Sequence, residues 1–331
     1  MTPFRTPIPT PSFPFQLRHR DQLLSIGSCF AENIGSRLAT SKFAICQNPF
    51  GILYNPMSIL RGLQLIQAGY SFAENDLFLS RGLWHSFQHH SQFSNTDPKQ
   101  VLTQLQSSLD AAHKTLQKCR CLFLTFGTAY VYQHIESDEI VANCHKLPAS
   151  QFRKYRLATS EIVASYRALL VALNTTFPNL QIILTISPVR HIKDGILENQ
   201  RSKATLLLAA DTLCEIFDFV HYFPSYEYLM DDLRDYRFYA EDMLHPSKVA
   251  VDYIWRQFQQ SFFSATTLQL QKKIEKISKS AAHRPFQVGS EAHQTFLRNL
   301  LTRIEILTRE HPYLNFKQEK DGIYRQLSSN N

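Results

Sequence analysis

The sequence contains little glycine, and its glycines are placed too far apart for the common nucleotide-binding motifs. Only 10 of the 331 residues are glycine, and no two of them are separated by a single residue. The dinucleotide fingerprint is therefore absent, and no Gly-Lys-Ser or Gly-Lys-Thr ends a phosphate-binding loop. We expect neither a nucleotide nor a nicotinamide enzyme, and no other cofactor is indicated.

The chain also lacks paired cysteines, long apolar runs and dense blocks of basic charge. Its 6 cysteines include no C-x-x-C pair, and Cys119 and Cys121 lie in a predicted strand, which argues against a zinc site and a disulfide scaffold. No apolar run approaches the roughly 20 residues of a membrane span, and residues 1–14 lack the apolar core of a secretory signal. The net charge of +7 comes from scattered residues, which argues against nucleic-acid binding. We expect a cytoplasmic globular protein.

Apolar runs alternate with helical patterns through most of the chain. Hydrophobic residues make up 44% of the sequence, enough for a sizeable core. Runs without polar alternation, typical of buried parallel strands, occur at 23–26, 43–46, 121–126, 181–186 and 219–223. Apolar residues at helical spacing occur at 32–38, 58–68, 159–173, 202–217 and 247–262. The alternation predicts the α/β class and a doubly wound sandwich over about residues 20–262.

Four segments fall outside this alternation. Residues 1–19 are expected to form an extended N-terminal segment. Residues 70–118, with a stretch rich in histidine and aromatic residues from Trp84 to Phe93, are expected to form an insertion over the sheet edge. Renewed helical spacing predicts a C-terminal helical appendage over 265–316. The polar residues 317–331 are expected to fray.

Two short motifs at opposite ends of the α/β region carry groups suited to nucleophilic catalysis. The first, Gly27-Ser28-Cys29, is predicted to form a tight turn between a strand and a helix, at the sheet edge where such folds bind ligands. In the second, Asp242 precedes His245 by three residues and can hold the imidazole Nδ1, which leaves Nε2 free as a base. Each motif alone is more often structural, but their positions at both ends of the pattern favour a catalytic site.

A larger set of motifs resembles one family over about residues 4–316. They are Gly27–Gly35, Asn48–Pro56, Thr125–Ala129, Asn143–Pro148, Ser187–His191 followed by Lys193–Gly195, Asp231–Tyr239 and Asp242–Pro246. On these motifs the chain is similar to the GSCFA family, a branch of the SGNH (GDSL-like) hydrolase superfamily. The resemblance implies a flavodoxin-like three-layer sandwich with a parallel sheet and, by analogy with the superfamily, acyl-ester chemistry.

The resemblance also ranks two candidate nucleophiles. When the superfamily block Gly-Asp-Ser-Leu is laid on this chain without a gap, Ser28 takes the place of the Asp and Cys29 that of the catalytic Ser. Cys29 is therefore the expected nucleophile, with His245 as base and Asp242 as its orienting group, and a thioester as intermediate. A helix N-terminus or an imidazolium is expected to lower the pKa of the thiol. The alternatives are Ser28 as nucleophile, after a one-residue slip, and a buried, inert Cys29.

The predicted oxyanion hole departs from the superfamily pattern. The resemblance implies backbone N–H donors at Cys29 and Gly51, but Ala129 stands where the superfamily has a third donor, an Asn side chain. A methyl group cannot donate a hydrogen bond, and losing one such donor costs about 2.7–4 kcal/mol of transition-state stabilisation. Either Thr128 or Asn143 substitutes for it, or the reaction is not ordinary ester hydrolysis.

Four residues are expected to bind the substrate: Trp84, His145, Arg190 and His191. Arg190 and His191 follow the fourth strand and can bind a carboxylate or phosphate, with pairing of Arg190 to Asp232 or a neighbouring acid as the alternative. His145 lies in a polar loop of a kind that often binds ligands, and Trp84 can cover an acyl pocket. No metal site is expected, because the spaced histidines of the aromatic stretch lack an acidic third ligand.

The sequence leaves three functions open. The first is an acyl hydrolase or acyltransferase that uses Cys29 on a small-molecule acyl, carbohydrate or lipid substrate. The second is a serine esterase that uses Ser28. The third is a non-catalytic protein that binds an acylated or phosphorylated carbohydrate or lipid, which the missing Asn donor favours. The sequence specifies neither the acyl donor and acceptor nor the oligomeric state.

Overall fold

A five-stranded parallel sheet forms the centre of the structure, a computed structural model that describes residues 6–283 and 290–328. Its strands are β1 (Gln22–Gly27), β2 (Ala44–Gln47), β5 (Cys119–Phe126), β9 (Gln181–Ile186) and β10 (Val220–Tyr222). They lie in the order β10-β9-β5-β1-β2. Numbered by their appearance along the chain, this is the order 2-1-3-4-5 of doubly wound, flavodoxin-like sheets. The predicted α/β class with a parallel sheet is confirmed.

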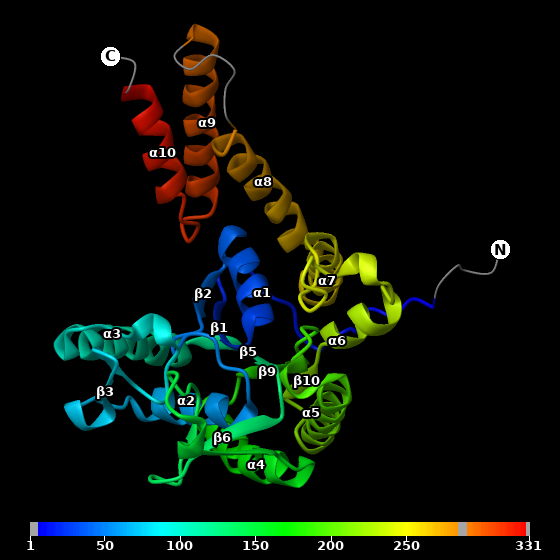
Figure 1. Ribbon diagram of the computed structural model, residues 1–331. Helices are drawn as coiled ribbons and strands as arrows, with labels where there is room; N and C mark the ends of the chain where they lie inside the picture. The colour runs from blue at the N-terminus through cyan, green and yellow to red at the C-terminus, as the bar shows by residue number, and fades with distance from the viewer. Residues whose placement is uncertain (1–5, 284–289, 329–331) are drawn as a thin grey trace.

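Helices cover both faces of this sheet because successive strand residues point to opposite sides. In β5, Cys121 and Phe123 contribute to one apolar cluster, whereas Leu122 and Leu124 contribute to the other. The first face is covered by α1 (Cys29–Thr40) and α7 (Lys248–Phe262). The second is covered by α2 (Pro56–Ala68), α3 (Pro98–Leu116), α4 (Thr159–Thr176) and α5 (Ile196–Ile216), as Figure 1 shows. The result is a three-layer arrangement with a core on each side of the sheet.

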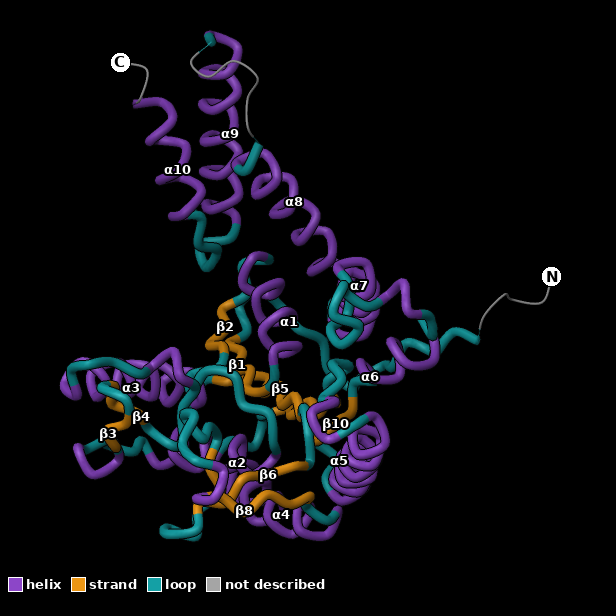
Figure 2. Tube along the Cα trace, viewed as in Figure 1, coloured by secondary structure: helices purple, strands orange, loops and turns teal. Residues whose placement is uncertain are grey.

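The predicted insertion at 70–118 is too long. Its first part does stand apart, as a hairpin of β3 (Phe78–Ser80) and β4 (Leu83–His85) that lies beside α3 in Figure 2. Its second part is α3, whose Leu109, Ala112 and Leu116 are fully buried in the sheet's second core. Helix α3 is thus part of the connection from β2 to β5 rather than an addition at the edge.

A second, antiparallel sheet was not predicted from the sequence. It contains β6 (Tyr130–His134), β7 (Ile140–Val141) and β8 (Phe152–Arg156), in the order β7-β6-β8. The hydroxyl of Tyr130 donates to Glu198 Oε2 at 2.5 Å and connects this sheet to the start of α5. The remaining short helical turns are Glu74–Asp76, Ser91–Phe93, Ala149–Gln151, Ile192–Asp194, α6 (Ser225–Glu227), Tyr228–Asp232 and Tyr236–Phe238.

The N-terminal segment packs against the end of α7. Of the predicted extended segment, residues 1–5 lie outside the described residues, and the rest forms no helix. The backbone N–H of Leu17 donates to the Phe262 carbonyl at 2.7 Å, and the Phe13 ring stacks on the Phe262 ring with centroids 4.6 Å apart. Leu17 itself is fully buried, so this segment closes the core on the α7 side.

Three helices form the C-terminal appendage: α8 (Ala265–Ala281), α9 (Glu291–Glu310) and α10 (Lys317–Ser328). In Figure 1 they project away from the sheet beyond α1 and α7. The expectation that residues 317–331 fray is wrong for 317–328, while 329–331 lie outside the described residues. Helix α10 escaped prediction because Ile323, only 1% exposed, is its one fully buried side chain.

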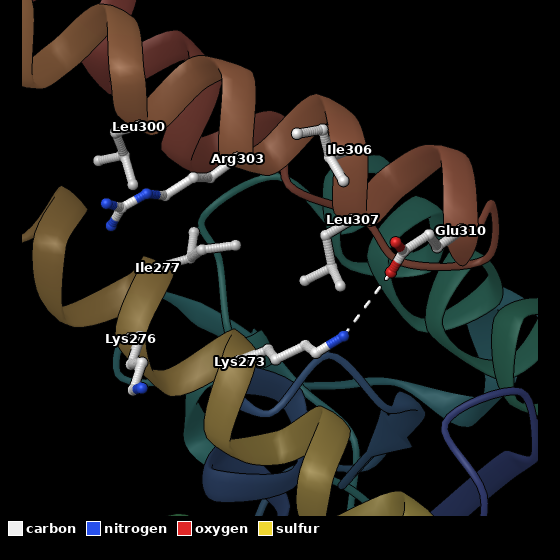
Figure 3. Close-up of a pocket in the computed structure, with 8 residues that line it drawn as sticks. All are labelled: Lys273, Lys276, Ile277, Leu300, Arg303, Ile306, Leu307 and Glu310. Atoms are coloured by element: carbon white, nitrogen blue, oxygen red, sulfur yellow. Dashed lines mark ion pairs between the residues drawn. The ribbon is translucent and has the colours of Figure 1, made fainter.

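The appendage has an apolar core of its own and a groove on its surface. Figure 3 shows the groove between α8 and α9, a cavity of about 250 Å³ with Ile277, Leu300 and Leu307 among its lining residues. Lys273 on α8 and Glu310 on α9 approach to 3.7 Å across one end of it. Within the described residues, no helix combines the length and the apolar character that a membrane span requires.

Two polar contacts attach the appendage to α1 at the end opposite Cys29. Lys42, in the turn after α1, forms an ion pair with Glu319 of α10 at 2.6 Å, and both side chains are nearly buried. The Gln271 side chain of α8 donates to the Ser41 hydroxyl at 2.6 Å. These contacts fix the appendage against the α/β domain at the end of α1.

We expect Ile323→Ala to destabilise the appendage, because truncating a fully buried isoleucine leaves a cavity and costs about 2–5 kcal/mol. Tyr324→Ala is the matched control, since Tyr324 is the next residue of α10 and is 49% exposed. Urea unfolding, followed together with the rate of proteolysis within α10, measures both variants. Equal stability of the two variants would contradict the packing of α10 described above.

Candidate active site

The carboxyl ends of β1 and β5 approach each other closely at Gly27. A Cβ atom on Gly27 would lie 2.4 Å from the backbone oxygen of Thr125, so only glycine fits. The Ser28 N–H donates to that oxygen at 3.3 Å, and the Gly27 N–H donates to Asn48 Oδ1 at 2.9 Å. Since the chain leaves β1 and β5 toward opposite faces, this is the switch point at which doubly wound sheets bind ligands.

Ser28 is fully buried and serves as the N-cap of α1. Its hydroxyl oxygen accepts the Phe30 N–H at 3.3 Å, and its side chain has no exposure to solvent. A side-chain oxygen in this position satisfies one of the free N–H groups of the helix. The structure therefore gives Ser28 a structural role in the turn.

Cys29 is the first residue of α1 and is half-buried. Burial raises the pKa of its thiol above the ordinary value, although the adjacent backbone N–H groups of Phe30 and of Cys29 itself oppose this shift. The expectation that the helix N-terminus would lower the pKa is thus wrong for the resting protein, because loss of solvent outweighs the effect of these N–H groups. The thiol is protonated at neutral pH and requires a base for ionisation.

Asp242 and His245 form the expected pair. His245 Nδ1 lies 2.6 Å from Asp242 Oδ2, and Asp242 Oδ1 accepts the backbone N–H groups of Leu244 and His245 at 2.9 and 3.0 Å. These hydrogen bonds, the backbone ones first, lower the pKa of Asp242 to about 2. A carboxylate bound to Nδ1 leaves Nε2 to act as an acceptor. Both side chains are exposed, and His245 makes no hydrogen bond to Cys29 in this structure.

His191 lies between the Gly27–Cys29 turn and the Asp242–His245 loop. The Arg190 N–H donates to the Leu244 carbonyl at 3.2 Å, which places the loop after β9 beside the Asp242–His245 loop. His191 Nε2 lies 3.1 Å from the position of a Cβ on Gly127, which in turn lies 3.5 Å from the Ser28 Cβ. Burial lowers the pKa of His191 to about 3, and the charges of Lys203 and His245 add to this effect. His191 is therefore a neutral imidazole between the two halves of the site.

Sequence reasoning missed Lys203, which lies at the same sheet edge. Lys203 is only 1% exposed, and its Nζ donates to the carbonyl oxygens of Gly127 at 2.7 Å and Ser187 at 2.6 Å. Burial lowers the pKa of its ammonium to about 7, while the charge of Cys29 acts in the opposite direction. A signal was present in the sequence, because Lys203 stands three residues before Leu206 on the apolar face of the predicted helix.

Two of the expected oxyanion donors, Gly51 and Thr128, are engaged elsewhere. The Gly51 N–H donates to the Asn48 carbonyl at 2.7 Å within a turn, and the Thr128 N–H donates to the Tyr54 carbonyl at 3.0 Å. The Thr128 hydroxyl lies 3.1 Å from the Ser202 hydroxyl, and Asn143 Oδ1 accepts a backbone N–H within its own loop at 2.9 Å. Gly51 and Thr128 cannot donate to an oxyanion from their backbone or hydroxyl groups without giving up one of these contacts, whereas the contact at Asn143 Oδ1 leaves the side-chain NH2 group of Asn143 as a donor.

The residues expected to bind substrate separate into two groups. His191 and Arg190 lie beside the Asp242–His245 loop, and the Arg190 guanidinium stacks over the Tyr239 ring at 4.1 Å rather than standing open. His145 is buried instead in a cluster outside the sheet edge, where its Nε2 lies 2.9 Å from the Ser86 carbonyl and its ring centre lies 4.4 Å from that of His85. Trp84 belongs to β4 of the nearby hairpin.

The histidine-rich stretch forms a structural cluster rather than a helix. His89 is 1% exposed and is surrounded by the rings of Phe50, Phe72 and Phe93, and its Nδ1 lies 3.0 Å from the Ser86 hydroxyl. Burial lowers the pKa of His89 to about 3. Over residues 6–283 and 290–328, no three His, Cys, Asp or Glu side chains are grouped so that they could hold a metal ion.

Comparison with known proteins identifies the family. The model of the GSCFA family matches residues 22–258, and a second model, described as the C-terminal domain of a GSCFA domain protein, matches residues 274–329. The chain therefore belongs to the GSCFA family, and the second match includes α10. No curated protein and no solved structure matches the chain.

We expect the buried neutral histidines to make the fold sensitive to acid. A pKa of about 3 for His89, against 6.5 in the unfolded chain, means that the folded state binds fewer protons below pH 6.5. The free energy of unfolding therefore falls as the pH drops from 6.5 toward 3, by about 2 kcal/mol at pH 5 for one such histidine. His19, His145 and His191, whose pKa values burial lowers to about 4, 4 and 3, act in the same direction.

Urea unfolding of a His89→Asn variant at pH 7 and pH 5 measures this contribution. The variant should lose less stability than the wild-type protein between the two pH values, whatever its stability at pH 7. His283→Asn, at an exposed position after α8, is the control. The same pH dependence in the His89→Asn variant and in the wild-type protein would rule out the assigned role of burial.

Proposed function

We propose that this GSCFA-family protein is an acyl hydrolase or acyltransferase of the SGNH type, in which Cys29 forms a covalent thioester with the acyl group. The observation that carries the proposal is the position of the Cys29 sulfur. It stands at the N-terminus of α1 and at the switch point of the sheet, where burial raises the pKa of the thiol and the adjacent backbone N–H groups of Phe30 and Cys29 partly offset that rise. This arrangement supports negative charge on the sulfur and on an adjacent carbonyl oxygen.

The Asp242–His245 pair supplies the base in this proposal. Asp242 holds Nδ1 at 2.6 Å, so that Nε2 can take the proton of the Cys29 thiol when a substrate brings the groups together. Catalytic hydrogen bonds that are absent in a free enzyme often form only when the substrate binds. The raised pKa of Cys29 makes such a base necessary, since a free thiolate is not present at neutral pH.

The proposed reaction has two covalent steps. The sulfur of Cys29 attacks the acyl carbon, and the bond from that carbon to the oxygen or sulfur of the leaving group breaks. The leaving group takes the proton that His245 Nε2 received from the thiol. A water, alcohol or amine then attacks the thioester and gives a proton to His245, the carbon–sulfur bond breaks, and His245 returns that proton to the Cys29 sulfur. Thioesters react readily with amines, so the acceptor decides between hydrolysis and transfer.

Burial of Ser28 argues more strongly against the serine esterase than against the non-catalytic binding protein. A serine esterase would require the Ser28 hydroxyl to leave its N-cap position and to reach solvent, from which it is fully excluded. A non-catalytic binding protein is compatible with the structure, because the N–H groups of Gly51 and Thr128 already donate to backbone carbonyls. In the catalytic proposal, the N–H of Cys29 is the oxyanion donor. The exposed Asp242–His245 pair favours the catalytic proposal, because binding alone does not require it.

The proposed setting is the cytoplasm, and the proposed substrate a small acyl, carbohydrate or lipid ester or thioester. All six cysteines are free, which suits a reducing compartment. The neutral His191 and the stacked Arg190 lie where a polar group of such a substrate would be recognised beside His245. No nucleic acid is proposed as a partner, since the basic residues are scattered along the sequence.

The proposal is tested by incubating the protein with p-nitrophenyl acetate and acetyl thioesters and measuring the mass of the tryptic peptide 21–37, in which Cys29 is the only cysteine. We expect a single acetyl adduct that neutral hydroxylamine removes, as it does from thioesters. Cys29→Ala abolishes the adduct, and His245→Asn slows its formation by about 10²–10⁴-fold, the usual contribution of a general base.

Ser28→Ala is the matched control, because it removes the neighbouring hydroxyl and leaves the sulfur. The variant should still form the adduct, with stability lowered by about 1 kcal/mol for the lost N-cap. An adduct that depends on Ser28 and resists hydroxylamine would replace the proposal by a serine esterase. Absence of any adduct with both donors would favour the binding protein.

A further inference from the structure

We propose that Lys203 is a positioning residue for Cys29: its ammonium is the counter-charge of the Cys29 thiolate, and its hydrogen bonds fix the strand ends around the nucleophile. The inference rests on the proposed function in taking Cys29 as the reacting group. It concerns a residue that lies outside every motif that the sequence analysis singled out.

The position of Lys203 gives the first argument. Its Nζ donates to the carbonyl oxygens of Gly127 and Ser187, at 2.7 and 2.6 Å. Gly127 directly follows β5 and Ser187 directly follows β9, so one amine joins the carboxyl ends of two neighbouring strands. Gly127 is also the residue against which Ser28 and His191 pack. Lys203 thus lies on the inner side of the same edge at which the sulfur lies.

The burial of Lys203 gives the second argument. A lysine that is 1% exposed costs several kcal/mol to keep charged unless an anion or enough acceptors compensate for lost water. Two neutral carbonyl oxygens satisfy two of its protons, and no ion pair of Lys203 with an acidic side chain occurs among the described residues. A hydrophobic residue would fill this place at lower cost if packing were its only role.

The ionisable groups around Lys203 indicate which anion it serves. The charge of Cys29 on α1 acts to raise the pKa of Lys203, and the charge of Lys203 in turn acts to lower the pKa of the Cys29 thiol. The other groups that face it are His191, which is neutral, and Tyr226, whose ring centre lies 5.8 Å from Nζ and whose hydroxyl donates to Gln200. Of these, Cys29 is the group that the proposed reaction makes negative.

The two groups therefore form a coupled pair that shares one proton. In the resting state near pH 7 the sulfur holds a proton and Lys203 is partly deprotonated, with two N–H groups for its two carbonyl acceptors. When the thiol ionises, an ammonium at Lys203 offsets the new negative charge. Such a pair titrates in two macroscopic steps that belong to both groups. The thiolate then appears in part with the first step and completely with the second.

The test follows alkylation of Cys29 by iodoacetamide from pH 5.5 to 10.5, read on the tryptic peptide 21–37. For the wild-type protein we expect a rate profile with two inflections, the lower one near pH 7. For Lys203→Met, a neutral side chain of similar length, we expect one inflection above pH 9. A rise of one unit in the pKa of Cys29 makes alkylation at pH 8 about tenfold slower. Lys203→Arg, which restores the charge, should recover the rate at pH 8.

Several outcomes would overturn the proposal. Superimposable rate profiles for the wild-type and Lys203→Met proteins would overturn it. A Lys203→Arg variant that folds but reacts as slowly as Lys203→Met would also overturn it, because a purely structural role then explains the loss. Circular dichroism and thermal unfolding establish that each variant is folded. If Lys203→Met does not fold, the proposal is tested on the lower inflection of the wild-type rate profile. A lower inflection that persists in His191→Asn and His245→Asn variants supports the proposal, and its absence overturns it.

Alkylation also separates this inference from the proposed function. The reaction with iodoacetamide requires only the thiolate, and no acyl donor or acceptor takes part. If Cys29 forms no acyl adduct while the two-step profile is present, acyl chemistry is rejected and the role of Lys203 stands. If the adduct forms while the profile has a single high inflection, acyl chemistry stands and Lys203 is structural.

Discussion

The close approach of β1 and β5 at Gly27 is the constraint on which the site depends. With a Cβ at this position only 2.4 Å from the Thr125 oxygen, no other residue allows the two strand ends to meet. Their meeting buries Ser28 as an N-cap and starts α1 at Cys29, so that the sulfur stands at the N-terminus of the helix. Cys29 itself stays half-buried at this edge.

Burial and hydrogen bonding together decide which groups at the carboxyl edge of the sheet are charged. Burial acts on Cys29, His191 and Lys203 in the same sense, since it disfavours the charged form of each, and all three are held near neutrality in the resting state. A negative sulfur changes this balance, because it favours a proton on Lys203. Asp242 differs from them, as it is exposed and keeps its charge through hydrogen bonds to backbone N–H groups and to His245.

The sequence predicts those parts of the fold in which local pattern and tertiary environment agree. The apolar run 181–186 appears in the structure with the expected bounds, and the helix predicted over 159–173 appears as α4, three residues longer. Burial of both faces of a strand, or of one stripe of a helix, leaves a clear period in the sequence. The antiparallel sheet around β6 was missed, since its residues are half-buried and mix polar with aromatic side chains. Helix α10 was missed because it depends on partners far away in the chain, Lys42 among them.

For the candidate site, the sequence predicts partners that are near one another in the chain and fails for those that are not. Asp242 and His245 pair within one turn, as their spacing predicts. The pKa of Cys29 could not be predicted, because it depends on how deeply α1 is buried. His145 was assigned to the substrate from its polar loop, but the structure turns it into an aromatic cluster with His85. Lys203 was missed because its carbonyl acceptors, Gly127 and Ser187, follow two strands that lie elsewhere in the chain.

The ion pair between Lys42 and Glu319 has a mechanical consequence. It joins the last described helix to the turn that ends α1, and the 12 residues of α1 form a stiff rod with Cys29 at the other end. A bound protein that displaces α10 therefore also acts on α1, the helix that begins at Cys29.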